Sequence, residues 1–169
     1  MNRRRWLPLL ISLQVLILAT IASSWYAIDI WGKEIRLKTK PYDQSEPMID
    51  KEIDLVYQQS EISSSLWKGK QREYLQTSNR WYYAKLAPVG RTWEVQGIYP
   101  EKPTSHGDEV ILRTQVEEMD SKKVMLHFGL EEYTLPQGTH VNWPDNKPLI
   151  TKIKVAPWGQ AKVISVSEE

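Results

Sequence analysis

Cysteine is absent from this 169-residue chain, and histidine occurs only at His106, His127 and His140. A chain without thiols forms no disulfide framework and no thiolate metal site. No two of the histidines have a metal-ligand spacing such as H-x-x-x-H. Excess charge is also lacking: three of the 22 basic residues form the run at 3–5, and the rest of the chain holds 19 basic and 21 acidic residues. This balance excludes the electrostatic footprint of a nucleic-acid-binding protein.

Motifs for catalysis are equally sparse. Ser23 and Ser24 have no evident base beside them, as a serine nucleophile would need. The paired carboxylates Glu117-Glu118 and Glu131-Glu132 are sequence neighbours, so in a strand each pair points to opposite faces. There is no glycine-rich phosphate loop. We therefore predict a protein that is not an enzyme, with no catalytic residue, no cofactor and no metal.

The clearest positive feature is an uncharged stretch from Trp6 to Ile28. Its 23 residues span roughly 35 Å as a helix, which is enough to cross a bilayer. With Trp6 near one end and Trp25 and Trp31 near the other, the pattern predicts a transmembrane signal anchor over residues 6–31 with aromatic belts at both interfaces. A cleaved signal peptide is the alternative, but this stretch exceeds a typical 7–15-residue apolar region and lacks a clear A-x-A site.

Orientation follows from the flanks of that stretch. Arg3, Arg4 and Arg5 favour a cytoplasmic tail at residues 1–5. Four basic residues between Lys33 and Lys40 oppose them, yet long domains are translocated largely regardless of charge. We expect residues 32–169 to form an extracytoplasmic domain of a single-pass cell-membrane protein, with membrane lipid as its first partner.

After residue 32 the hydrophobic period changes to that of strands. Apolar and polar residues alternate over eight short segments separated by turn signals, the spacing of an all-β sandwich or barrel. These segments are 35–39, 53–57, 80–88, 92–100, 109–119, 122–130, 148–157 and 160–167. Residues 60–77 are ambiguous, with a short helical turn ending near Gly69. We predict a mainly β fold, with one apolar helix followed by a compact sandwich or barrel-like domain.

Two segments of the chain resemble each other. GKEIRLKT at 32–39 and GDEVILRT at 107–114 both open a strand, and each is followed by a second strand with matching alternation, at 55–57 and 126–128. This duplication suggests two pseudo-repeated halves, in which Leu37 and Leu112 are both buried. Amphipathic alternation alone would also generate part of the match.

At these segments the chain resembles the GDYXXLXY family of bacterial membrane-anchored proteins. The corresponding text is EIRLKTKPYDQ, DLVY, HGDEVILRT, FGLEEYTLPQG and VAPWGQAKVISV, and the naming motif departs, with Asp50-Lys51-Glu52 where Gly-Asp-Tyr would stand. The matching positions are Leu55, Tyr57, Gly107, Arg113, Gly129, Tyr133, Pro136 and Gly138. The resemblance implies a single-helix envelope protein without an established activity, often encoded near multi-pass membrane proteins.

Tryptophan and tyrosine are abundant beside a single phenylalanine. Trp81 with Tyr83, and Trp93 with Val95, alternate as core residues would, which leaves Trp143 and Trp158 as the better exposed contact candidates. Two functions remain open: an outer β domain that binds a multi-pass membrane protein or a second copy of itself, and a glycan or cell-wall module that stacks sugars on exposed aromatics.

Overall fold

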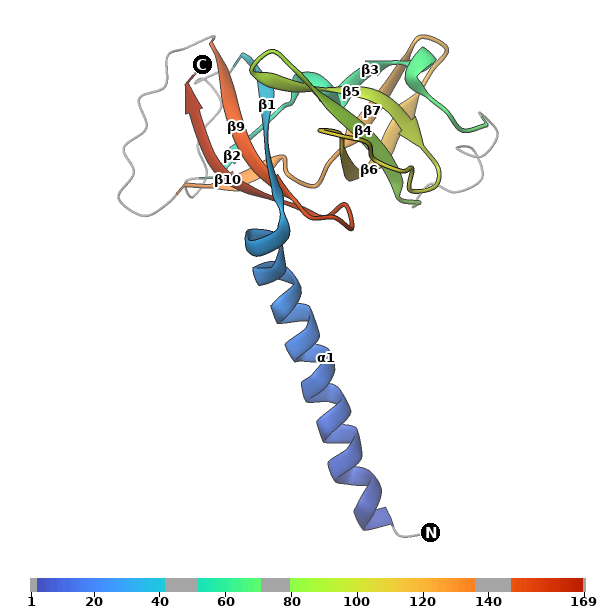
Figure 1. Cartoon of the computed structure of the whole chain (residues 1–169), viewed down its shortest axis with the longest axis vertical. Coiled ribbons are helices and arrows are strands. Elements are labelled where there is room, and N and C mark those ends of the chain that lie inside the picture. Colours follow the sequence, from blue (N-terminus) through green and yellow to red (C-terminus); the bar gives the residue numbers. More distant parts are fainter. Residues whose placement is uncertain (1–2, 42–51, 71–79, 136–146, 169) are drawn as a thin grey trace.

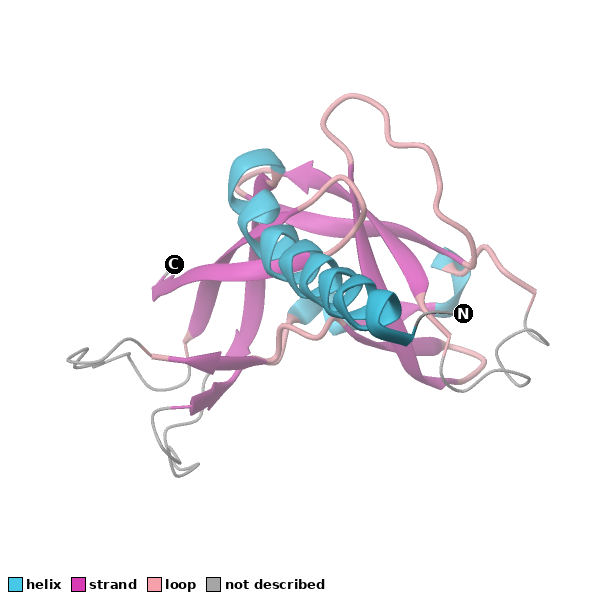
Figure 2. Cartoon of the chain, turned by 90° about the horizontal axis from the view of Figure 1, so that it is seen from below, coloured by secondary structure: helices cyan, strands magenta, loops and turns pink. Residues whose placement is uncertain are grey.

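The computed structural model describes residues 3–41, 52–70, 80–135 and 147–168. A single long helix, α1 (Arg3–Trp31), projects from one end of a β domain, and its N-terminal end lies far from that domain (Figure 1). Seen from below, the helix rises under the middle of the domain, with strands on either side (Figure 2). The chain is mainly β, as its periodicity predicts.

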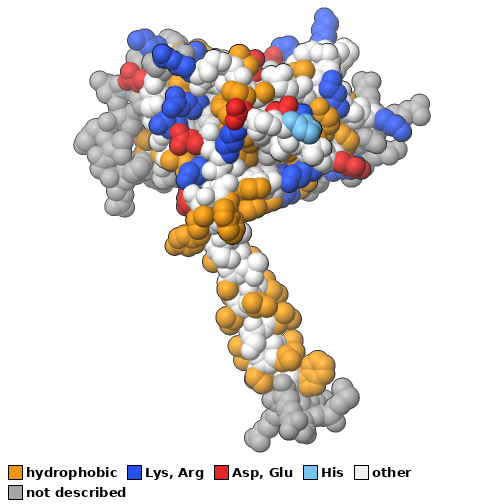
Figure 3. All heavy atoms as spheres, viewed as in Figure 1, with side chains coloured by type: hydrophobic (Ala, Val, Ile, Leu, Met, Phe, Trp, Pro, Cys, Tyr) orange, Lys and Arg blue, Asp and Glu red, His pale blue; other side chains and the backbone are white. Residues whose placement is uncertain are grey.

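Helix α1 meets the length and composition test for a membrane span over Pro8–Trp31, and an 18-residue window within it has a mean hydropathy of 1.8 and no buried residue. Apolar side chains run along it, whereas charged side chains gather on the domain (Figure 3). Three hydroxyls on the helix donate to carbonyls one turn earlier, those of Thr20, Ser23 and Ser24. Such back-bonding satisfies polar groups within the helix itself.

The strand that follows α1 belongs to a three-stranded antiparallel sheet. Its order is β1 (Lys33–Pro41), β9 (Pro148–Val155) and β10 (Ala161–Glu168). β9 and β10 form a hairpin around Trp158-Gly159, where Gly159 has a φ of +93°. The β9 burial pattern alternates strictly, which puts one face on the core and leaves the other outside.

Five further strands curl into a nearly closed barrel. Their order is β3 (Glu61–Ser63), β7 (Lys123–His127), β6 (Val110–Met119), β4 (Tyr82–Val89) and β5 (Thr92–Tyr99). A 3₁₀ turn, η2 (Ser64–Leu66), carries the chain from β3 towards β5. There Trp67 forms a parallel bridge to Ile98, and the Lys68 N–H donates to the Ile98 carbonyl at 2.9 Å. These contacts bring the two edges of the sheet together.

A two-stranded ladder of β2 (Glu52–Asp54) and β8 (Glu132–Thr134) completes the described strands, and η1 (Gln58–Ser60) follows β2. One apolar cluster connects these sheets, with Leu37 at 0% and Leu112 at 1% exposure. The predicted burial of both leucines is therefore confirmed.

Several local predictions need correction. Ten strands appear in the described part of the chain, because β3 and β8 are three-residue strands too short to show a period. Trp81 is 42% exposed and Tyr83 is half-buried, whereas Tyr82 is only 1% exposed. Placing Trp81 in the core was wrong because three successive aromatics obscure the parity of the strand, and a slip of one residue exchanges its faces.

Candidate functional site

The junction between α1 and β1 is short and heavily bonded. Ile28 is fully buried, and the Gly32 N–H donates to its carbonyl at 2.8 Å. A Cβ on Gly32 would clash with that same carbonyl, so the close turn from helix to strand requires glycine. One residue thus separates the helix from the first strand.

Asp29 fastens the end of the helix to the β9–β10 hairpin. Its carboxylate pairs with Lys162 at 2.8 Å, and its carbonyl accepts a hydrogen bond from the Lys154 ammonium group at 2.8 Å. A further tie joins the start of β1 to the turn before β6, where Lys33 binds the Asp108 carboxylate and carbonyl, both at 2.9 Å. Lys33 lowers the pKa of the Asp108 carboxyl below its usual value. The helix and the domain therefore make contact at several points.

Four of the family-motif positions meet where β2 and β8 join the core. The Leu55 N–H donates to the Glu131 carbonyl at 2.6 Å, and Tyr133 lies opposite Ile53 in the ladder. The fully buried Tyr57 donates its hydroxyl to the Leu130 carbonyl at 2.8 Å. Burial, followed by the nearby Glu131 carboxylate, raises the pKa of the Tyr57 phenol.

Gly129 supplies the turn that this arrangement needs. Its φ is +71°, in the left-handed region that favours glycine. The Glu131 side chain closes the turn by accepting the N–H groups of Phe128 at 2.6 Å and Leu130 at 2.8 Å. Leu55, Tyr57, Gly129 and Tyr133 thus form one structural cluster, in which the Leu55 N–H and the Tyr57 hydroxyl donate to backbone carbonyls of the turn at 130–131.

Arg113 and Gly107 lie elsewhere, on and just before β6. Gly107 has a φ of +58° in the preceding turn, and the Arg113 N–H donates to the Gly159 carbonyl at 2.8 Å. The Arg113 guanidinium stacks over the Trp81 ring, 4.6 Å from its centroid. A Cβ on Gly159 would come within 2.8 Å of Arg113 Cγ, which explains why glycine occupies this hairpin tip.

Of the two tryptophans predicted as exposed contact residues, Trp158 and Trp143, the structure describes only Trp158. Trp158 is half-buried at the tip of the β9–β10 hairpin, and its indole N–H donates to the Gln160 side chain at 3.1 Å. It is therefore less exposed than the sequence predicts, because the hairpin tip folds back on β6. Trp143 lies outside the described residues, together with Pro136, Gly138 and His140.

His127 lies on the face opposite the buried Leu126 and Phe128, and it has two acidic partners there. Its Nδ1 is 3.4 Å from Glu117 and 3.3 Å from Glu131, so two carboxylates far apart in sequence meet at one imidazole. No periodic pattern pairs residues across separate strands in this way. Within the described residues no group of three or more histidines or carboxylates is placed to hold a metal ion.

Comparison with known proteins identifies a family. The family model of the GDYXXLXY protein matches residues 14–166, which covers most of α1 and nearly all of the β domain. No curated protein and no solved structure matches this chain.

Proposed function

This chain belongs to the GDYXXLXY family, and we propose that it is a single-pass envelope protein whose outer β domain binds a multi-pass membrane protein. The observation that carries this proposal is the rigid junction, in which an exposed apolar helix passes through Gly32 directly into a folded domain. The chain acts by contact, without chemistry of its own.

Exposure along α1 supports retention of the helix in a membrane. Leu16 is 63% exposed, and Tyr26, Ile30 and Trp31 are 65–74% exposed. Cleavage at the small residues near Ser24 would leave the last three on the mature domain, facing water. In an anchor they lie at the membrane interface, where aromatic side chains are favoured. Arg3–Arg5 then keep the preceding tail in the cytoplasm.

The junction also limits the reach of the domain. Helix α1 ends at Trp31 and β1 begins at Lys33, so there is no linker to carry the domain away from the bilayer. The tip of the β9–β10 hairpin, Ala156–Gln160, lies at the helix end of the domain (Figure 1). A surface held in this way is suited to a partner embedded in the same membrane.

A glycan-binding module is the second candidate, but the surface favours it less. Sugar stacking needs a row of exposed aromatic rings. Of the described tryptophans and tyrosines outside α1, only Trp81 is exposed, and Arg113 covers one face of its ring. Contact with a protein therefore explains the described surface better.

Photocrosslinking in living cells tests the proposed contact. A photoreactive residue at Pro157, exposed at the hairpin tip, is expected to crosslink to a membrane protein that also co-purifies in mild detergent. The matched probe at Lys122 lies in the β6–β7 turn at the far end of the domain and is expected to remain uncrosslinked. Equal labelling from both positions would refute the contact, and a product of two copies would indicate self-association instead.

A second variant separates contact from catalysis. Replacing His106, His127 and His140 together with Gln is expected to leave the cellular phenotype of the gene unchanged, whereas deleting residues 6–28 abolishes it. Loss of function in the triple variant at normal folded abundance would instead indicate an active site.

A further inference from the structure

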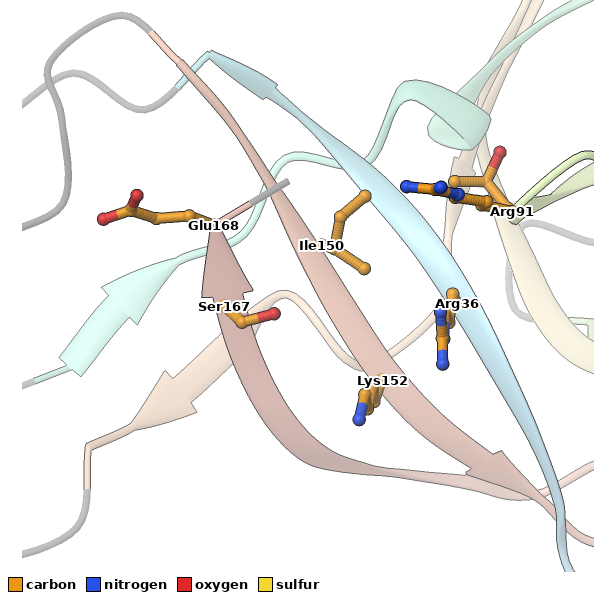
Figure 4. Close-up of a pocket in the computed structure, with 7 residues that line it drawn as sticks. Arg36, Arg91, Ile150, Lys152, Ser167 and Glu168 are labelled. Carbon is orange, nitrogen blue, oxygen red and sulfur yellow. The ribbon is translucent and has the colours of Figure 1, made fainter.

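The outer face of the three-stranded sheet holds an open pocket of about 260 Å³ beside the β4–β5 turn. Ile150 contributes an apolar side chain to its lining, and Thr92 and Ser167 contribute hydroxyl groups. Three cationic side chains, Arg36, Lys152 and Arg91, also line it (Figure 4). Glu168 also lines the pocket, but its carboxylate points away from the other labelled side chains (Figure 4). Positive charge therefore dominates the opening.

Two of these cations face each other directly. Arg36 on β1 is the registered partner of Lys152 on β9, and like charges opposite each other in a ladder are destabilising. Arg91 reaches the same pocket from the β4–β5 turn, across β1. In the part of the chain that the structure describes, none of the three forms an ion pair.

The surrounding cations behave differently. Further along the same face, Lys154 and Lys162 are both bound to Asp29, and Lys33 is bound to Asp108. Among the described residues that line the pocket, Arg36, Lys152 and Arg91 have no such acidic partner. The two arginines supply planar pairs of N–H donors that match the oxygens of a phosphate group.

We propose that this pocket binds a phosphate group, either free phosphate or the phosphate of a larger molecule. A volume of about 260 Å³ lies just below the usual range of small-molecule pockets, so it suits one such group. Bound phosphate would neutralise the Arg36–Lys152 repulsion, and the two hydroxyls would supply further hydrogen bonds. Ligand binding and domain stability are therefore coupled at this site.

The position of the pocket indicates the source of the phosphate. Arg36 is four residues beyond Gly32 on a strand that continues away from the helix, about 13 Å at roughly 3.3 Å per residue. If α1 spans the bilayer, this distance exceeds the headgroup layer, which is about 5–8 Å thick. A soluble phosphate or phosphorylated solute therefore fits better than a lipid headgroup.

Thermal unfolding of the full chain in a neutral detergent tests the site with inorganic phosphate, using chloride at equal ionic strength as the reference. Phosphate is expected to raise the Tm of the wild-type chain and not that of R36Q/K152Q. The matched double variant K68Q/K122Q removes two exposed cations elsewhere and is expected to respond as the wild type does. Equilibrium dialysis with labelled phosphate should show binding at least about tenfold weaker in R36Q/K152Q.

The Tm of R36Q/K152Q in the absence of phosphate distinguishes a binding site from a pair of residues that only stabilise the fold. At low salt, R36Q/K152Q is expected to unfold at the same temperature as the wild type or higher, because the repulsion is gone. Equal phosphate responses in all three proteins, or no response in any, would overturn the proposal. In nanodiscs, a Tm rise with anionic lipid that requires Arg36 and Lys152 would keep the phosphate site and assign the lipid headgroup as its source.

Discussion

Replacing Tyr57 with Phe isolates one hydrogen bond in the family-motif cluster. The ring of Tyr57 packs edge-on against Phe128 with centroids 6.0 Å apart, and Phe at position 57 preserves that contact. The lost hydroxyl leaves the Leu130 carbonyl without its 2.8 Å donor at a buried site. Because a buried polar group left unsatisfied costs about 1–3 kcal/mol, we expect a loss of about that size in the free energy of unfolding.

The pH dependence provides a second, independent signature. The pKa of the Tyr57 phenol is raised from an ordinary value of 10.0. In the unfolded chain it ionises near that value, while in the folded chain it stays neutral. The contribution of Tyr57 is thus complete below pH 10 and is lost as the pH rises above it. The stability difference between wild type and Y57F should therefore shrink in alkaline solution.

Urea unfolding followed by tryptophan fluorescence, at pH 7 and at several values above about 10, measures both effects. Tyr83 is a suitable control, since it is half-buried and its hydroxyl forms no hydrogen bond within the described residues. Y83F is expected to change neither the stability nor the alkaline trend. If Y57F matched the wild type at pH 7 and followed the same alkaline course, the assigned hydrogen bond and its burial would both be wrong.

Three further measurements address the core, the charges and the topology. Leu37→Ala and Leu112→Ala should each lower the free energy of unfolding by about 2–5 kcal/mol. The control Val56→Ala, at a 52% exposed site, should lower it by less than about 0.5 kcal/mol. A negligible loss at both leucines would refute their burial. Lys123 and Lys40 lower the pKa of Glu61 from its ordinary value of 4.5, so its stabilisation is present above that pH and is lost as the pH falls through the lower folded value. Acid unfolding of Glu61→Gln should lack this component, and an unchanged acid profile would contradict the ion pairs. Protease added to spheroplasts should digest residues after about Gly32 and spare the helix, whereas complete protection, or a soluble form without α1, would exclude the anchor.

The spacing of apolar residues along the sequence predicts most of the fold. The uncharged run from Trp6 predicts α1, because about 20 consecutive apolar residues are long enough to form a helix that crosses a bilayer. Strand alternation predicts the inward positions Leu37 and Leu112, since successive side chains point to opposite faces. Turn chemistry predicts the β4–β5 and β9–β10 hairpins, where Gly90 and Gly159 have positive φ.

Hydrophobic periodicity and turn residues do not predict the candidate sites. Arg36 and Lys152 are 116 positions apart, and only the pairing of β1 with β9 places them side by side. The meeting of Glu117 and Glu131 at His127 likewise depends on how β6, β7 and the following turn pack. Local patterns specify which face a residue occupies, whereas a site requires knowledge of which strands are neighbours.

The duplicated segments illustrate where local pattern and long-range pairing agree. Thr39 on β1 bridges Tyr57 on the segment that follows β2, and Gln115 on β6 pairs with His127 on β7. Thr39 and Thr114 are both buried. The Thr39 hydroxyl accepts a hydrogen bond from the Leu149 N–H, whereas the Thr114 hydroxyl donates one to the His127 carbonyl.

Amphipathic alternation accounts for burial at matching positions of the two segments. The aromatic residues that end the two units, Tyr57 and Phe128, also contact each other, with their ring planes at 74°. The two units therefore join at equivalent points in one core. They differ in their second neighbours, since β1 pairs with β9 whereas β6 pairs with β4. Alternation within each strand is thus enough to explain the matching burial, and an internal duplication of the two segments stays a prediction.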